Sequence, residues 1–243
     1  MNDFTELLNE AARDRSHPNV PPRDAATLIV IDTSGGVPRV LLGRRHAGHT
    51  FIPGKFVFPG GRLEPSDRRV AGTVAMDPIM EAQLSREVKR PGPVLARALA
   101  LAAIRETFEE TGLLLGAKAK DPVQFPDGPW STIAATGWSP DLAQIHFVAR
   151  AITPPGRPKR FDTRFFCADA SAIVYRVEGV VGPEAELVEL VWLPMADAGQ
   201  LDMPAVTSVV LTELESRIAA GLRRELPVPF YRMLHGRFVR TLL

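Results

Sequence analysis

Residues 93–112 most restrict what this chain can fold into, because they predict one long helix with crowded negative charge near its end. Pro93 stands in the first turn, where the missing N–H of proline costs nothing, and the interior is rich in alanine and leucine. Gly112 follows the last polar residue, as a C-terminal cap does. The sequence therefore predicts a helix over residues 93–111.

Three glutamates share one side of this predicted helix. Glu106 and Glu110 are four residues apart and Glu109 is three from Glu106, so their carboxylates crowd together and repel one another. A hard divalent cation removes this repulsion, and Mg²⁺ or Mn²⁺ prefers carboxylate and water oxygens. Arg105, four residues before Glu109, can brace it through a charge-assisted hydrogen bond. The pattern predicts a divalent-metal site, with an exposed acidic helix end as the alternative.

The segment before this helix predicts a hairpin and then a short strand that ends in a glycine turn. Residues 25–32 and 37–42 are rich in strand-forming residues, and the two glycines in residues 33–36 suit a tight turn between them. Residues 56–58 form a short strand that runs into Pro-Gly-Gly at 59–61. The paired glycines allow the backbone to approach a metal or a phosphate closely.

The rest of the chain alternates strand and helix patterns. Strands are predicted at residues 143–152, 161–168 and 186–193, and a helix at 204–220. The final stretch, 222–243, is basic and aromatic. The pattern is compatible with an α/β fold.

Composition excludes several classes of protein. The chain is 45% hydrophobic and 23% charged, as expected of a soluble globular protein, and its net charge of +1 gives no electrostatic case for nucleic acid or membrane. No apolar run of ~18 residues is present, so no membrane span is expected. Cys167, the single cysteine, is expected to pack inside a strand. A cytoplasmic location is expected, because the first residues show no signal peptide.

The glycine turn and the acidic helix together resemble the Nudix box. That family motif is Gly, five residues, Glu, seven residues, then Arg-Glu-aliphatic-any-Glu-Glu-any-Gly-aliphatic. Asp67 stands where the first glutamate belongs, Thr107 replaces an aliphatic residue, and 37 residues rather than seven separate Asp67 from Arg105. The box would therefore contain an insertion, which we assign to residues 68–92, because loop length costs little free energy. The residues that match the motif are Gly61, Arg105, Glu106, Glu109, Glu110, Gly112 and Leu113.

An interrupted box resembles a Nudix subgroup that includes peroxisomal coenzyme A diphosphatases. Three further segments carry this resemblance: Arg44-Arg45, the stretch from Phe51 to Gly61, and the run Arg160-Phe-Asp-Thr-Arg-Phe-Phe at 160–166. Thr50 stands where a coenzyme A signature of a sister group has an arginine. The resemblance covers residues 25–196.

The resemblance implies an α/β/α sandwich around a mixed β-sheet, with the insertion inside the box. We expect an N-terminal arm at residues 1–23, a hydrolase domain at 24–222 and a C-terminal extension at 223–243. A homodimer is expected from the family and from the aromatic, basic tail. We also expect the insertion to alter substrate choice and to leave metal binding intact.

The resemblance also assigns roles to residues. Glu106 and Glu110 would be the principal ligands of Mg²⁺ or Mn²⁺, Glu109 a further ligand, and the Gly60 carbonyl would complete the site. Together with Arg105 these glutamates would form the catalytic group. Glu186 and Glu189 are the candidates for a general base outside the box, although a box carboxylate could serve instead. The expected phosphate contacts are Arg44, Arg45, Arg160 and Arg164, since guanidinium groups suit phosphate oxygens; for each, an ordinary ion pair is the alternative.

The implied activity is hydrolysis of a pyrophosphate bond in a small-molecule nucleotide, namely a nucleoside diphosphate linked to another moiety. Coenzyme A or acyl-coenzyme A is the favoured substrate class. The alternatives are ADP-ribose, dinucleotides or capped RNA, or a Nudix-like nucleotide-binding module without turnover. Nucleic acid is not the expected partner, because the near-neutral chain offers no broad basic track.

Overall fold

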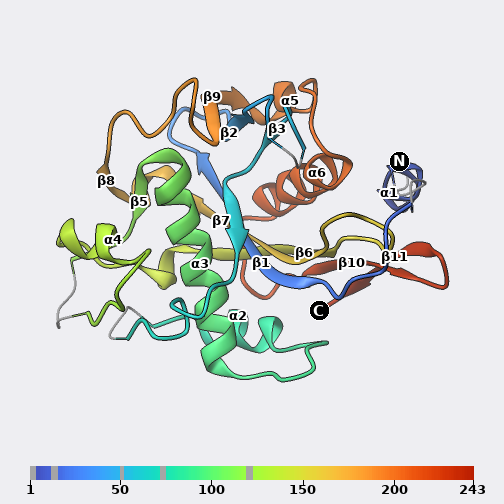
Figure 1. Cartoon of the computed structure of the whole chain (residues 1–243), viewed down its shortest axis with the longest axis horizontal. Helices are drawn as coiled ribbons and strands as arrows, with labels where there is room; N and C mark the ends of the chain where they lie inside the picture. The colour runs from blue at the N-terminus through green and yellow to red at the C-terminus, as the bar shows by residue number, and fades with distance from the viewer. Residues whose placement is uncertain (1–3, 12–15, 50–51, 72–74, 119–122) are drawn as a thin grey trace.

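The computed structural model describes residues 4–11, 16–49, 52–71, 75–118 and 123–243 (Figure 1). Within these ranges a nine-stranded sheet runs in the order β11-β10-β6-β7-β1-β2-β3, with β4 paired to β1 and β9 paired to β2. The strands are β1 (Arg23–Asp32), β2 (Arg39–Arg45), β3 (Phe56–Val57), β4 (Gly60–Arg62), β6 (His146–Ile152), β7 (Phe161–Asp169), β9 (Leu187–Pro194), β10 (Pro229–Leu234) and β11 (Arg237–Leu242). The sheet is mixed, because β1 with β7 and β6 with β10 are parallel pairs and the other pairs are antiparallel.

Helices and a small second sheet complete the described structure. The two strands of the second sheet are β5 (Leu113–Leu115) and β8 (Ile173–Arg176). The helices are α1 (Phe4–Ala11), α2 (Pro78–Leu84), α3 (Pro93–Thr111), α4 (Ser131–Ala135), α5 (Met195–Ala198) and α6 (Ala205–Ala219), with 3₁₀ turns at Leu142–Gln144 and Ala170–Ala172. In Figure 1 the green α3 lies left of the central strands and α6 lies to their upper right.

The large sheet is the middle of three layers. Successive strand residues point to opposite faces, so Leu28 and Val30 of β1 pack in the same core cluster as the buried residues of α3. Ile29 and Ile31 pack in the other cluster, which contains the buried residues of α6. The predicted α/β/α sandwich around a mixed sheet is therefore confirmed.

Elements with strong local signals lie close to where the sequence predicts them. β1 and β2 form the predicted hairpin, and the Ser34 N–H and hydroxyl donate to Asp32 in its turn. The helix predicted at 93–111 is α3, with Gly112 at a φ of 74° as its C-cap and its N–H bonded to the Phe108 carbonyl. The predicted buried strand cysteine is confirmed, since Cys167 is fully buried in β7 and burial raises its pKa to about 12.

The insertion and the tail contain elements that local patterns did not predict. The insertion forms α2, which begins at the N-cap Asp77 and buries Met80 and Leu84 in the same core cluster as α3. The tail forms the β10–β11 hairpin, and β10 joins the large sheet beside β6, with Phe230 opposite Arg150. Both elements are stabilised by contacts with distant segments, which local composition does not reveal.

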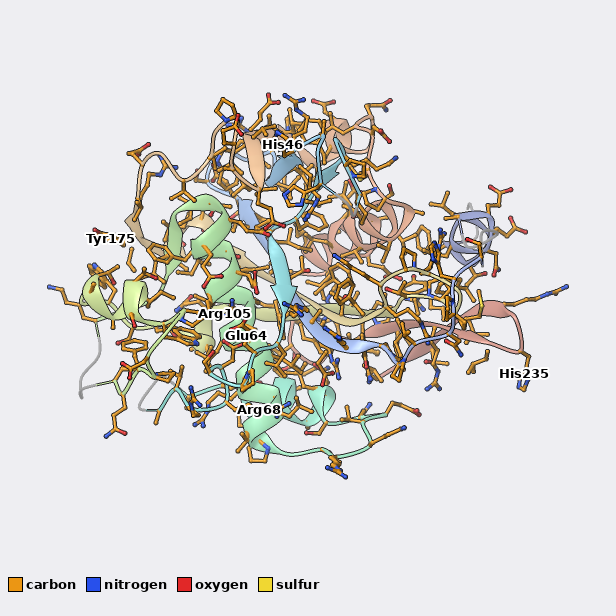
Figure 2. The ribbon with its side chains drawn as sticks, viewed as in Figure 1. His46, Glu64, Arg68, Arg105, Tyr175 and His235 are labelled. Carbon is orange, nitrogen blue, oxygen red and sulfur yellow. The ribbon has the colours of Figure 1, made fainter. Side chains whose placement is uncertain are left out.

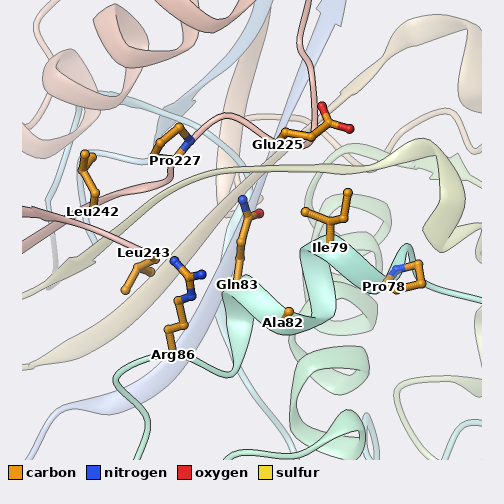
Figure 3. Close-up of a pocket in the computed structure, with 9 residues that line it drawn as sticks. All are labelled: Pro78, Ile79, Ala82, Gln83, Arg86, Glu225, Pro227, Leu242 and Leu243. Atoms are coloured by element: carbon orange, nitrogen blue, oxygen red, sulfur yellow. The ribbon is translucent and has the colours of Figure 1, made fainter.

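A hollow of about 590 Å³ lies between α2 and the end of the chain (Figure 3). Its lining includes Gln83, Arg86, Glu225 and Leu243. Gln83 also donates to the carbonyls of Arg224 and Leu226, so this side chain ties the insertion to the tail. None of the predicted site residues lines this hollow. Among the described residues, no helix has the length and apolar character needed to cross a membrane.

Candidate functional site

A cavity of about 1180 Å³ lies where β1, β4 and β7 meet the last turns of α3. Its other walls include residues 20–22 before β1, residues 158–161 before and at the start of β7, Arg45 of β2, Glu186 before β9, and Pro204, Val206 and Thr207 near the start of α6. Figure 2 labels Glu64 and Arg105, two of the residues that line it beside α3. Most of the predicted site residues meet here.

The glycine turn and the acidic end of α3 are in direct contact. The Gly60 N–H donates to the Glu110 carboxylate at 3.0 Å. A Cβ atom on Gly61 would lie 2.4 Å from the Glu106 carboxyl carbon, which is closer than atoms can approach. A glycine at this position therefore makes room for the Glu106 carboxylate against the turn.

Arg105 links the carboxylates around it. Its Nη1 donates to Glu106 at 2.8 Å and to Glu109 at 3.0 Å, and its Nη2 donates to the Arg62 carbonyl at 3.1 Å. Its Nε donates to Asp67 at 2.8 Å. Burial disfavours the Arg105 charge, but the bond to Asp67 and the charges of its carboxylate neighbours outweigh burial and raise its pKa. The predicted contact between Arg105 and Glu109 is present.

Asp67 is a residue that sequence reasoning undervalued. Its side chain is fully buried and accepts four hydrogen bonds, from the Glu64 N–H, from Arg105 Nε and Nη2, and from the Trp130 indole N–H. Trp130 comes from a loop outside the box and is itself fully buried. In the sequence, Asp67 was marked only by its position in the box pattern, where the family has a glutamate.

The pKa values of the three box glutamates are all raised above the usual value. Burial raises the pKa of Glu106 to about 7, and burial likewise raises the pKa of Glu109; Arg105 opposes both shifts. The pKa of Glu110 is raised well above its usual value by burial and then by the nearby charge of Glu186. Each shift reflects the free-energy cost of a negative charge on a buried carboxylate, and a cation bound between these groups would offset that cost.

The residues at this end of the cavity fit a hard divalent cation in their chemistry. Glu106, Glu109 and Glu110 supply carboxylate oxygens beside the Gly60 backbone, and such oxygens are the ligands that Mg²⁺ and Mn²⁺ prefer. As placed, no three His, Cys, Asp or Glu side chains among the described residues stand close enough to hold one ion. Arg105 and the Gly60 N–H engage the carboxylates instead, so metal binding requires these side chains to reorient.

The two candidate general bases occupy different places. Glu186 lines the cavity and pairs with Arg45 at 2.8 Å, whereas Glu189 is outside the lining and pairs with Arg44 at 2.8 Å. Between the partners of Arg44 and Arg45, β9 carries one extra residue, Val188. Such a bulge re-aims neighbouring side chains. The structure therefore brings Glu186 and Arg45 to the site and leaves Glu189 and Arg44 outside it.

The remaining two predicted phosphate contacts also separate. Arg160 lines the cavity, and its guanidinium donates to the Thr153 carbonyl, the Asn19 side chain and the Val20 carbonyl. Arg164 is 1% exposed and lies outside the cavity lining. The expectation of a phosphate contact by Arg164 is corrected here, because strand alternation points it to the opposite face from Phe165.

The interior position of Arg164 has a structural explanation. Its Nη1 pairs with Asp24 at 2.6 Å and with Asp162 at 3.2 Å. Asp162 also binds Arg150 through both carboxylate oxygens, at 2.8 and 2.6 Å. The motif at residues 160–166 therefore contributes a buried ion-pair network on one face of β7, while Phe161, Thr163 and Phe165 line the cavity on the other.

Several cavity residues carried no sequence signal. Arg23, Arg62 and Lys159 line the cavity, yet none belongs to the motif residues that pointed to the site. The insertion contributes no described residue to the lining. The expectation that the insertion alters substrate choice therefore has no support from its position.

Comparison with known structures identifies the family. No protein-family model matches the sequence. A Nudix hydrolase from Alicyclobacillus acidocaldarius is similar at 33% identity, over 79% of this chain and 90% of that chain, with a TM-score of 0.57. The Nudix domain of Shewanella oneidensis NrtR, solved with ADP ribose, is 14% identical over 82% of this chain and 90% of that chain, with a TM-score of 0.44. A Caenorhabditis elegans Ap4A hydrolase is 15% identical over 81% and 99%, with a TM-score of 0.41.

The last two likenesses are too distant to bear on function. The Alicyclobacillus acidocaldarius Nudix hydrolase exceeds 30% identity over more than two thirds of both chains. The glycine turn and the Arg-Glu cluster at the cavity are the features by which the sequence resembles the same family. This chain belongs to the Nudix hydrolase family.

Proposed function

We propose that this Nudix pyrophosphohydrolase cleaves nucleoside diphosphates linked to another moiety, and that coenzyme A or acyl-coenzyme A is its favoured substrate class. One observation carries the proposal: Glu106, Glu109, Glu110 and Glu186 line one cavity beside the Gly60-Gly61 turn. Hydrolysis of such a bond adds water across P–O–P, so that one P–O bond breaks, another forms, and two monophosphates leave.

We propose Glu106 and Glu110 as the principal metal ligands, with Glu109 and the Gly60 carbonyl completing the set. A divalent cation bound there supplies polarisation of the phosphoryl oxygens and activation of water. Arg105 orients Glu106 and Glu109 through its two Nη1 bonds. The ion is Mg²⁺ or Mn²⁺, since all the proposed ligands are oxygens.

Glu186 is our candidate for the general base. It lies close enough to Glu110 to raise the pKa of that residue, and its own carboxylate is held by Arg45. From this position Glu186 can accept a proton from the attacking water, and Arg45 can neutralise charge on the phosphate. Glu189 has no comparable access, because it does not line the cavity.

The choice of coenzyme A rests on the resemblance of the interrupted box and of the segments 51–61 and 160–166. Thr50, where a related signature has arginine, lies outside the described residues. ADP-ribose and dinucleotides remain the alternative substrates, and capped RNA or a module without turnover remain the alternative functions. The presence of all three box glutamates favours turnover.

The domain division remains part of the proposal: an arm at 1–23, a hydrolase domain at 24–222 with the insertion 68–92, and an extension at 223–243. Residues 1–3 and 12–15 of the arm lie outside the described residues. The extension is hydrogen-bonded to the large sheet through β10 and β6. A homodimer and a cytoplasmic location remain predictions.

A product assay tests the proposed reaction. The purified protein is incubated with Mg²⁺, then with Mn²⁺, against coenzyme A, acyl-coenzyme A, ADP-ribose, diadenosine polyphosphates, nucleoside triphosphates and capped RNA, and the products are separated by chromatography. Release of adenosine 3′,5′-bisphosphate from coenzyme A supports both reaction and substrate. Turnover of another compound keeps the reaction and discards coenzyme A. No turnover of any compound contradicts the proposal and favours the binding module.

A further inference from the structure

Four cations that the proposed reaction does not use line the cavity. Arg23, Arg62, Lys159 and Arg160 all line it, and Arg23, Arg62 and Lys159 are exposed. Within the described part of the chain, these three form no ion pair. The two other arginines of the cavity wall differ, because Arg45 and Arg105 are both paired with carboxylates.

Arg160 is held in place without losing its charge. Its Nε donates to the Thr153 carbonyl at 3.0 Å, and its Nη1 donates to Asn19 at 2.6 Å and to the Val20 carbonyl at 2.7 Å. All three acceptors are neutral oxygens. The guanidinium is therefore positioned at the cavity wall while its positive charge remains available to an anion.

Strand register sets the separation between the two ends. Thr27 of β1 lies opposite Gly60, beside the glutamates, whereas Arg23 lies beside Phe161 at the start of the strand. Four residues of β-strand span roughly 13 Å, at about 3.3 Å per residue. Arg23, Lys159 and Arg160 therefore lie at a different part of the cavity from the box glutamates, within the reach of one extended nucleotide. Arg62, which is opposite Ala25, lies between the two ends.

One carboxylate also lies near these cations. Glu64 lines the cavity and follows Arg62 by two residues, and its charge also contributes to the raised pKa of Glu109. It accounts for one negative charge against four positive charges, so the local balance remains +3. A group with two negative charges, such as a phosphate monoester, would match this balance and the donor geometry of guanidinium groups.

We propose that Arg23, Arg62, Lys159 and Arg160 form a subsite for a second anionic group of the substrate, a phosphate monoester on the nucleoside, separate from the diphosphate that is cleaved. The inference rests on the proposed function, because it takes the cleaved diphosphate as the first anionic group of the substrate. It implies that the enzyme prefers nucleotides with an additional phosphate over those without one.

Calorimetry without metal tests this subsite independently of turnover. The probes are adenosine 3′,5′-bisphosphate and adenosine 5′-monophosphate, which differ by the one phosphate in question. We expect the bisphosphate to bind about tenfold more tightly or better, because a charge-assisted contact contributes roughly that factor. Adenosine 2′,5′-bisphosphate is the third probe; equal preference for it also supports the subsite and assigns it no positional selectivity.

Single substitutions locate the effect. Lys159→Ala and Arg23→Ala should each reduce the preference for the bisphosphate several-fold and leave the affinity for the monophosphate nearly unchanged. Arg237→Ala is the matched control, because it removes an exposed arginine at the start of β11, outside the cavity. Equal affinities of the wild-type protein for the two probes would overturn the subsite, as would an equal loss in the control. Thermal unfolding verifies that each variant is folded.

The outcome is separable from the proposed function. Hydrolysis of a diphosphate without any preference for the bisphosphate keeps the reaction and removes the subsite. A preference that disappears in Lys159→Ala, in a protein that hydrolyses none of the diphosphates, keeps the subsite and removes the reaction.

Discussion

At the level of single residues, the acidic end of the cavity consists of carboxylates held by donors from the chain itself. Glu110 accepts the Gly60 N–H, and Glu106 accepts Arg105. A divalent cation would have to replace these donors. Each glutamate can therefore be tested by a variant that keeps its shape and removes its charge.

Glu110→Gln should reduce turnover by at least about 100-fold, because loss of a metal ligand removes several kcal/mol of transition-state stabilisation. The amide oxygen of the new side chain can still accept the Gly60 N–H, so the fold should persist. Steady-state kinetics at saturating metal measure the effect. Glu189→Gln makes the same change of charge at an exposed pair outside the cavity, and turnover should change by less than about twofold. Near-normal activity of Glu110→Gln would show that the metal assignment is wrong.

Substitutions at Asp67 and Trp130 should lower the stability of the fold. Asp67→Asn removes the buried countercharge of Arg105 and should lower the free energy of unfolding by about 3–5 kcal/mol. Trp130→Phe removes one hydrogen bond to Asp67 and should cost about 1–3 kcal/mol. Urea unfolding measures both. If Asp67→Asn is as stable as the wild-type protein, the Asp67–Arg105 pair does not stabilise the box.

At the level of elements, α2 supports α3 from outside the cavity. Leu84 is 3% exposed in the core cluster shared with α3, while Ile79 on the same helix is 39% exposed. We therefore expect the insertion to act on the stability of α3 and not on the proposed substrate site.

Leu84→Ala should lower the free energy of unfolding by about 2–5 kcal/mol, because it leaves a cavity beneath α2. The KM for the substrate should stay unchanged, since no described residue of the insertion lines the cavity. Ile79→Ala is the control on the same helix, with an expected loss below about 1 kcal/mol. Chemical denaturation and kinetics measure the two quantities. A changed KM with unchanged stability would mean that the insertion contacts substrate.

At the level of the whole molecule, the large sheet joins segments that are far apart in sequence. β1 pairs with β7, and β6 pairs with β10 from the tail. His146 begins β6 in this interior, and its Nδ1 is buried without a hydrogen-bond partner among the described residues. Burial, and then the charges of Arg224 and Arg217, lower its pKa to about 4.

This lowered pKa predicts a pH dependence of stability. Above about pH 6.5, the ordinary pKa of histidine, His146 is neutral in both the folded and the unfolded chain. As the pH falls toward 4, the unfolded chain binds a proton that the folded chain does not, so stability is lost across that window. His146→Gln should make the fall in unfolding free energy between pH 6.5 and 4 shallower. Denaturation at a series of pH values measures it; identical slopes would contradict the assignment.

Local sequence patterns were sufficient for α3, for its Gly112 cap and for the first hairpin. Proline at a first turn, glycine at a C-cap and glycines in a tight turn act over a few residues, so their effect is visible without knowledge of the fold. The box spacing likewise predicted that Arg105 contacts Glu109, since residues four apart in a helix are neighbours. The same residues carried the resemblance to the Nudix family, and that resemblance implied the α/β/α class.

Only the tertiary structure decided which distant side chains belong to the site. The bulge in β9 separates Glu186 from Glu189, and strand alternation in β7 turns Arg164 inward while Arg160 reaches the cavity. The buried contact between Asp67 and Trp130 joins residues 63 positions apart. Such contacts depend on strand register and on packing between segments remote in the chain, and neither is encoded in a local pattern.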